Sequence, residues 1–269
     1  MRMSVGEVGA DFPPGFLRSC PSSAEKRIAS AAPTPLSSPG MTEIPGSSAR
    51  IPLVALSDVV AFPCTDLELE IRDPRQRSLV RHVIERDREG WVGLVLLKPS
   101  WVRSESEAAE IFSAGTAGRV MEVEIFADGR ASLRVHGEYR FELEREVGGE
   151  PYRQGLVHPI EEPRFDDRDA AVKVVREGIV AFARTLAEGG ETSVPFGPER
   201  VEALCHVPFE ELVNQLAQEL DLPALRKLEL LTETILDRAL SILQILEGRK
   251  RVADLLRPYR HLAARSPLN

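Results

Sequence analysis

Residues 115–143, GTAGRVMEVEIFADGRASLRVHGEYRFEL, decide the fold because their order specifies a β-hairpin. Apolar and polar residues alternate on both sides of Asp128-Gly129, a dipeptide typical of tight turns between antiparallel strands. We predict one apolar face that carries Met121, Val123 and Ile125 on the first strand and Ala131, Leu133 and Val135 on the second. We predict that a third strand follows, with Tyr139, Phe141 and Leu143 inward and Arg140, Glu142 and Glu144 outward.

The segments around this hairpin add more strands and one helix. Apolar and polar residues alternate strictly at 67–72, LELEIR, which predicts a strand with one buried and one solvent-exposed face. Pro74 then opens a helix, and Gly90 follows the end of that helix. Residues 91–101, WVGLVLLKPSW, begin as a continuous apolar run typical of a strand buried on both faces, and a last strand is expected near 152–160. Several short strands at this spacing predict a small, partly closed antiparallel β-barrel.

After Pro163 the pattern becomes helical. One helix is predicted around 170–186 and stops at Gly189-Gly190, and shorter helices are predicted at 199–206 and 209–220. The predicted fold class is therefore α+β: a barrel half at 49–162, followed by a C-terminal helical bundle half at 163–250.

The last helix is predicted to run without a break from about 224 to 247. Its apolar positions are spaced alternately three and four apart, as in a heptad seam: Leu225, Leu228, Thr232, Ile235, Ala239, Ile242 and Leu246. Leu231, Leu236 and Leu243 widen this seam. A broad stripe packs into a bundle more often than into a two-stranded coil, so a bundle is the preferred interpretation.

The two ends differ in composition from the middle. Residues 30–48, SAAPTPLSSPGMTEIPGSS, contain few large apolar side chains, so we predict a disordered tail over 1–48, with a docking peptide as the alternative and Met41 as a possible start. Residues 251–269 are predicted to be a basic tail, with a solvated end favoured over contact with an acidic partner.

Composition excludes several classes of protein. A hydrophobic fraction of 43% with 28% charged residues fits a globular protein without a membrane-spanning or secretory segment. Three scattered cysteines form no CxxC pair, which favours a reducing compartment and hence the cytoplasm. The net charge of −8 disfavours nucleic acid as a partner.

Taken in this order, the segments resemble the N-terminal substrate-binding domain of the Lon protease family. The resemblance rests on an opening strand with a proline at 51–53, a D-V-V-x-F-P corner at 58–63 and the strand-helix-strand unit at 67–97, followed by the glycine-led hairpin at 118–135 and the helices of 166–247. It covers about 200 residues of the 269. The KPSW ending at Trp101 and the helices after 198 look more like stand-alone bacterial members than like full proteases. At Cys64, where family members usually carry glycine, we expect a different local turn, because cysteine visits positive φ less readily.

The parts of a Lon protease that carry out chemistry are not found in the sequence. There is no G-x-x-x-x-G-K-[ST] phosphate loop, and the chain ends before the family's serine–lysine peptidase domain. The five histidines show no metal-binding spacing. We therefore expect no enzyme activity, no catalytic residue, no cofactor and no metal.

The resemblance implies a non-catalytic recognition or adaptor module in protein quality control or proteolysis. Its expected partners are unfolded or extended polypeptides, with a protease or other protein as a further candidate partner, bound through exposed apolar surface. Trp101 and Phe112 are the candidate partner-binding residues, whereas core packing is favoured for Trp91. The alternative is nucleic-acid binding, because the family's barrel is similar to the PUA type, with Arg75, Arg77 and Arg81 as a basic strip. Against it, residues 51–161 contain 14 Lys and Arg and 20 Asp and Glu, a net charge of −6.

Overall fold

A computed structural model of the chain describes residues 49–71, 74–85, 90–99, 109–128, 130–148, 150–163, 165–189 and 194–259. Several predicted features lie outside these residues: the segment 1–48 with Met41, the candidate Trp101, Gly129 of the predicted turn, and positions 260–269 of the basic tail.

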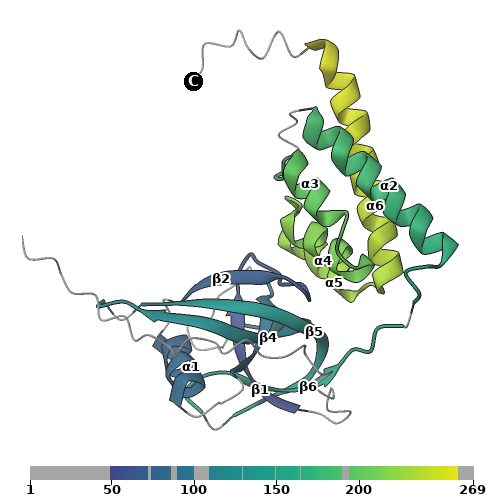
Figure 1. Cartoon of the computed structure of the whole chain (residues 1–269). Helices are drawn as coiled ribbons and strands as arrows, with labels where there is room; N and C mark the ends of the chain where they lie inside the picture. The colour runs from purple at the N-terminus through teal and green to yellow at the C-terminus, as the bar shows by residue number, and fades with distance from the viewer. Residues whose placement is uncertain are drawn as a thin grey trace, which may run out of the picture. The chain divides into compact units, whose positions relative to one another are not determined.

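Within the described residues, six strands form one mixed sheet, and one helix lies in the connection from the second strand to the third (Figure 1). The elements are β1 (Ala49–Leu56), β2 (Asp66–Ile71), α1 (Pro74–Glu85), β3 (Trp91–Leu97), β4 (Ile111–Ile125), β5 (Ala131–Val147) and β6 (Gln154–Pro159). The order in the sheet is β2-β5-β4-β3-β1-β6, and β6 also pairs with β5, so these pairings close on themselves. With the helices that follow, the chain is α+β as predicted.

The prediction of a small, partly closed antiparallel barrel is confirmed only in part. β1 runs parallel to β3, with Leu53 opposite Gly93 and Leu56 opposite Leu96. A parallel pair needs a long connection, and here β2 and α1 supply it. The result is a mixed six-stranded sheet, with β2 added beside β5, rather than a clean barrel.

The predicted strand faces hold for β2 and β3. In β2, Leu69 and Ile71 are buried whereas Glu68 and Glu70 are exposed, so the alternation was interpreted correctly. In β3, positions 92–96 are all buried. Side chains of β3 contribute to hydrophobic clusters on different sides of the sheet, which explains its continuous apolar sequence.

β5 joins the second and third predicted strands into a single strand of 17 residues. Leu133 is fully buried and Glu142 is exposed, as predicted. Arg140, predicted to point outward, is only 3% exposed, so that prediction is wrong. The reason is that the helical half covers this position, where Arg140 donates hydrogen bonds to the carbonyls of Leu231 and Glu233.

The predicted inward face of β4 is also partly wrong. Val123 lies opposite Leu133 and packs against the core, but Met121 and Ile125 are 60% and 52% exposed. The pairing register shifts between Val120 and the residue after Met121, which makes Met121 the extra residue of a β-bulge. Ile125 occupies the last pair before the turn, where little of the core remains to cover it.

Five α-helices and a short 3₁₀ helix make up the described helical half. They are α2 (Ala170–Glu188), α3 (Pro198–Leu204), α4 (Phe209–Glu219), α5 (Ala224–Thr232), α6 (Ile235–Leu256) and η1 (Arg257–Tyr259). The carboxylate of Asp169 caps α2 by accepting a hydrogen bond from the amide of Ala171, and α2 ends at Gly189 as predicted.

The prediction of one unbroken last helix is wrong. The chain leaves the helical conformation at Glu233, and Thr234 starts α6 as its N-cap, with its hydroxyl accepting a hydrogen bond from the amide of Asp237. Heptad spacing continues across this break because Leu228 and Ile235 both face the same core. Spacing alone therefore could not reveal it.

Two residues of the corner at 58–63 belong to the core of the helical half. Val60 and Phe62 are buried in a cluster formed mainly by helix residues, and the amide of Phe62 donates a hydrogen bond to the Gln218 side chain of α4. The conspicuous Phe-Pro sequence therefore links the sheet to the helices.

Cys64 follows this corner in the left-handed region, with φ of 58°. Its amide donates to the carbonyl of Gly137, and the amide of Gly137 donates to the carbonyl of Thr65. A Cβ at Gly137 would lie 2.3 Å from the carbonyl oxygen of Phe62, so this close approach requires glycine. We expected the cysteine to alter the turn, yet Cys64 itself takes the conformation that glycine favours, at a cost of about 1–2 kcal/mol.

Candidate functional site

The two aromatic residues predicted as partner-binding candidates are not brought together. Phe112, near the start of β4, is half-buried and packs against the hydrophobic cluster of the helical half. Trp101 lies outside the described residues. Trp91 is half-buried at the start of β3, where its ring lies 5.5 Å from that of Tyr139 and 4.8 Å from the Arg119 guanidinium. Phe112 therefore offers little surface to a partner.

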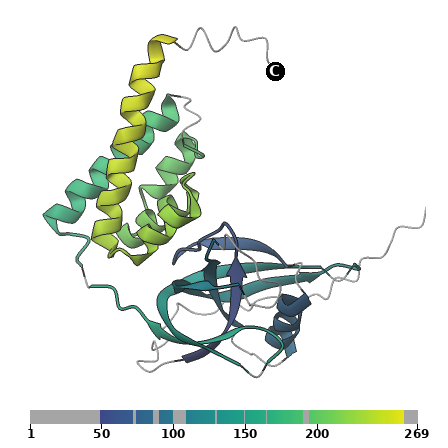
Figure 2. The ribbon, with the colours of Figure 1, turned by 180° about the vertical axis from the view of Figure 1, so that it is seen from behind.

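Three other apolar side chains are exposed where β4 approaches its turn. Met121 is 60% exposed, Ile125 is 52% exposed and Phe126 is 36% exposed. We call these three residues the hairpin patch. Figures 1 and 2 show the turn end of the β4–β5 hairpin at the margin of the sheet half. The three residues are close together in the chain near the turn, and exposed large apolar side chains mark candidate interaction sites.

Among the described residues, the backbone of β4 beside the hairpin patch pairs on one side only and so forms a sheet edge. Within the described residues, β3 pairs with β4 as far as Arg119, and the carbonyl of Gly90 accepts one more hydrogen bond from the amide of Val120. From Met121 onward, β4 pairs with β5 alone among the described strands. An edge of this kind can receive an extended peptide as an added strand.

Charged residues of both signs surround the hairpin patch. Arg130 bridges Glu70 and Asp128 at 2.6 Å each, and its guanidinium lies 5.5 Å from the ring of Phe126. Hydrogen bonds from the backbone and side chain of Arg130 lower the pKa of Asp128. The border of the patch is therefore mixed in charge and does not form a basic surface.

Two buried arginines, on the part of β5 away from the turn and on α6, join the sheet to the helices. Arg140 of β5 donates to the carbonyls of Leu231 and Glu233 at 2.6 and 2.8 Å and pairs with Glu162 at 2.6 Å. Arg238 of α6 is fully buried and donates to the same two carbonyls at 3.2 and 3.0 Å. Together they satisfy backbone oxygens at the end of α5, where the helix leaves them without partners.

Burial dominates the electrostatics of Arg238. Desolvation lowers the pKa of its guanidinium to about 10, and the nearby positive charge of Arg140 acts in the same direction. Glu162 opposes this shift. Arg238 therefore remains charged at neutral pH, and its side-chain contact with Asn214 holds α6 against α4.

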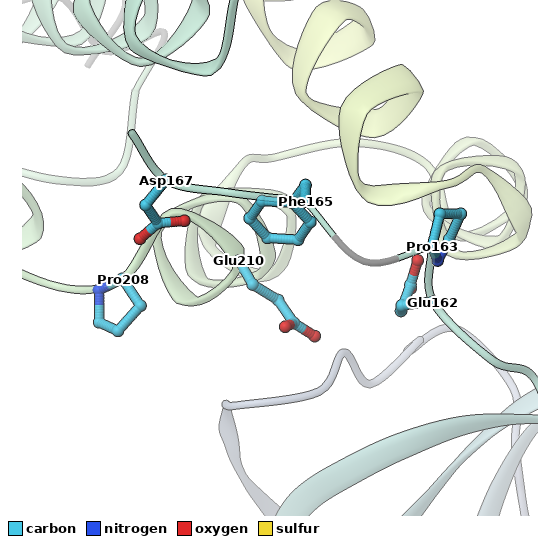
Figure 3. A pocket seen from close by; sticks show the side chains of 6 residues that line it. All are labelled: Glu162, Pro163, Phe165, Asp167, Pro208 and Glu210. Carbon is cyan, nitrogen blue, oxygen red and sulfur yellow. The ribbon is translucent and has the colours of Figure 1, made fainter. Parts of the chain in front are cut away.

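An open hollow lies beside this junction, between the segment that leads into α2 and the start of α4 (Figure 3). Its volume is about 440 Å³. It is lined by Glu162, Pro163, Phe165, Asp167, Pro208 and Glu210. Arg140 holds Glu162, and Asp167 accepts a 3.4 Å hydrogen bond from the amide of Phe209. Burial and then the charge of Glu162 raise the pKa of Glu210. Because these contacts fix the connection between sheet and helices, we interpret the hollow as part of the junction.

The described residues hold no group of three or more His, Cys, Asp or Glu side chains placed to bind a metal ion. None of the described helices combines the length and hydrophobicity required to cross a lipid bilayer.

Residues 50–248 match the family of the ATP-dependent protease La (LON) substrate-binding domain. The chain belongs to this family. Among its relatives, Lon protease 2 of Myxococcus xanthus is 25% identical over 226 residues, which cover 83% of this chain and 26% of that protein. Lon protease of Anaeromyxobacter dehalogenans is 26% identical over 206 residues, which cover 76% of this chain and 23% of that protein. The chain thus spans about a quarter of the length of these relatives.

Two solved structures share the Lon-type fold. The N-terminal domain of Mycobacterium avium complex Lon protease matches with a TM-score of 0.54 and 17% identity, covering 74% of this chain and 98% of that one. A Lon N-terminal domain protein from Xanthomonas campestris matches with a TM-score of 0.50 and 21% identity, covering 73% and 98%. At these identities the likeness establishes the fold alone.

The hairpin patch was missed by sequence reasoning because strict alternation assigns Met121 and Ile125 to the core. One signal was present: the hairpin segment is longer than the neighbouring strand at 91–97, so part of it must extend past that strand. Side chains on that part have a neighbouring strand on one side only, so more of their surface is exposed to solvent.

Proposed function

We propose that this chain is a non-catalytic recognition module that binds extended or unfolded polypeptide, and that the hairpin patch with the adjoining edge of β4 is its binding surface. The observation that carries the proposal is the exposure of Met121, Ile125 and Phe126 beside a sheet edge. Membership in the Lon substrate-binding family supports the class of ligand.

Physically, such a surface suits a client without a fixed fold. An extended segment can add main-chain hydrogen bonds along the edge of β4, while its apolar side chains cover Met121 and Ile125. Main-chain pairing does not depend on client sequence, and apolar contact is tolerant of shape. The combination gives broad specificity for chains whose apolar residues are exposed.

The remaining parts of the proposal concern the cellular role, the functional unit and the contact residues, which the family assignment does not specify. We propose a role in proteolysis or protein quality control, without ATP hydrolysis, in a reducing compartment such as the cytoplasm, where a protease could be a second partner. Residues 49–250 are proposed as the functional unit, with a PUA-like sheet half and a helical bundle half. Trp101 remains a candidate contact, and Phe112 is a weaker one because core packing covers it.

Nucleic-acid binding is not favoured by any feature of the described surface. Residues 51–161 carry a net charge of −6, and the exposed patch is bordered by acidic as well as basic groups. Phosphate contact requires a positive surface, which this half of the chain does not provide.

The test is the affinity for a denatured model protein between about 50 and 200 mM salt. We expect little salt dependence, because ionic screening barely affects apolar contact. The double variant Met121→Ser/Ile125→Ser should bind roughly 10- to 30-fold more weakly, since each lost side chain contributes about 1 kcal/mol at half exposure.

The matched control is Val174→Ser, which removes a 69% exposed apolar side chain from α2. It should leave the affinity unchanged. A steep loss of affinity with salt, or equal effects of the control and the double variant, would sink the proposed surface.

A further inference from the structure

A second group of exposed apolar side chains lies at the C-terminal end of α6. Val252, Leu255, Leu256 and Tyr259 are 55, 72, 57 and 61% exposed. Their spacing of three, four and seven residues places them on one side of the helix and of the 3₁₀ turn that ends it. We call these four residues the α6 stripe. In Figures 1 and 2 the yellow end of α6 extends past the other helices of the helical half.

The α6 stripe continues a regular seam. Ile245, Gly248, Val252, Leu255 and Tyr259 alternate in steps of three and four, the spacing by which one helix packs along another. Ile245 is half-buried, and a Cβ added at Gly248 would meet no atom within 4 Å. The seam is therefore narrow and open at Gly248, which allows close approach of a second helix.

Arginines border this seam on both sides. In heptad terms Arg249 and Arg251 occupy the two flanking positions, where paired helices usually exchange charges. The guanidinium of Arg249 already donates a 2.6 Å hydrogen bond to the carbonyl of Asp221, so Arg251 is the flanking charge that faces solvent. The side chain of Arg251 is 75% exposed, and its 2.6 Å pair with Glu247 is an exposed contact of little energy. Between Gly248 and Tyr259 the chain carries four basic residues and one acidic residue, Asp254, although the whole chain has a net charge of −8.

We propose that the α6 stripe docks an amphipathic helix with acidic flanks, supplied by another polypeptide. The apolar seam of that helix would cover the stripe, and its flanking carboxylates would pair with the exposed Arg251 and meet the positive charge of this segment. Charge disfavours a second copy of this chain, because the positively charged segment 248–259 would then lie against itself. A membrane surface is the competing occupant that the vesicle measurement below tests, because basic residues beside an apolar stripe also attract anionic lipid.

This surface is separate from the proposed recognition surface. It lies beyond residues 50–248, the part that matches the substrate-binding family, and on a different element from the hairpin patch. A module with both surfaces could hold a client through its sheet while its last helix contacts a different protein.

The experiment titrates two fluorescent peptides of about 21 residues into the full chain and follows their anisotropy. Both peptides repeat leucine at the seam positions, and they differ only at the flanks, which are Glu in one and Lys in the other. We expect the Glu-flanked peptide to bind at least about 10-fold more tightly, and Leu255→Ser to weaken it about 10-fold. Arg251→Glu should remove most of the preference between the peptides.

Leu240→Ser is the matched control, because Leu240 is 45% exposed on another side of the same helix. It should leave both affinities unchanged, as should Met121→Ser/Ile125→Ser, which separates this proposal from the recognition surface. Equal affinity for the two peptides, or no binding at 100 µM of the Glu-flanked one (about 5 kcal/mol of binding free energy), overturns the proposal. Self-association that Leu255→Ser abolishes, or tighter binding to anionic vesicles than to the peptide, overturns it in favour of a second copy or a lipid surface.

Discussion

Replacing Arg140 by methionine is expected to destabilise the protein strongly, although methionine fits the alternating sequence of β5 well. The side chain is 3% exposed, and its removal leaves the carbonyls of Leu231 and Glu233 with fewer donors and Glu162 without its 2.6 Å partner. Breaking a buried ion pair from one side costs about 3–5 kcal/mol. Arg238 still lies 3.8 Å from Glu162, so we expect the lower end, about 3 kcal/mol.

The assay is equilibrium unfolding in urea. With a slope of about 2–3 kcal/mol/M, a loss of about 3 kcal/mol lowers the midpoint by roughly 1–1.5 M. Arg134→Met is the control on the same strand, because Arg134 is 41% exposed and its pairs with Glu122 and Glu68 are 3.3 and 3.7 Å long. Such exposed pairs contribute about 0–1 kcal/mol.

The double variant Arg140→Met/Glu162→Gln tests the cause. Because it also removes the charge left unpaired, it should recover about 1–2 kcal/mol relative to Arg140→Met alone. Equal midpoints for Arg140→Met and Arg134→Met would refute the reasoning, since the buried junction would then contribute no more than a surface pair.

Three further predictions concern the strand faces of β5, the Cys64 thiol and ATP turnover. Leu133→Asp should unfold the sheet half, because Leu133 is fully buried and an unpaired carboxylate there costs several kcal/mol, whereas Glu142→Lys on the exposed face of β5 should leave the melting temperature unchanged; similar melting of both would contradict the assigned faces. Burial, and then the charges of Glu210 and Glu211, raise the pKa of the Cys64 thiol from 9.0 to about 11, so at pH 8 alkylation of Cys64 should be about 100-fold slower in the folded than in the unfolded chain. Because the folded pKa is the higher one, stability should fall as pH rises from about 9 towards 11, and fast alkylation at pH 8 would argue against burial of this thiol. The purified chain should turn over no ATP, and protein-dependent hydrolysis would overturn the non-catalytic proposal.

The sequence predicts the parts of this fold that depend on local alternation. β2 and the apolar run of β3 could be predicted because each strand packs against the same surroundings along its whole length. The Lon-type resemblance was likewise available from the order of short segments at 51–63 and 118–135.

The features that the sequence did not predict depend on which parts of the chain pack against a residue in the folded structure. Arg140 alternates like an outward residue, but carbonyls contributed by α5, far along the chain, make its position a buried one. The α5–α6 break was missed because Leu228 and Ile235 keep heptad spacing across it, although Thr234 followed by Asp237 is a usual helix-start signal. The exposure of Met121 follows from a bulge, which changes the register without changing the sequence pattern.

The most direct test of the account places a photo-crosslinking residue at position 121 or 125 of the hairpin patch, or at position 174 of α2, and irradiates each protein with a denatured model client. We expect crosslinks to the client to form at 121 and 125 and not at 174. Crosslinks at 174 alone, or equal yields at all three positions, would contradict the claim that clients bind along the edge of β4.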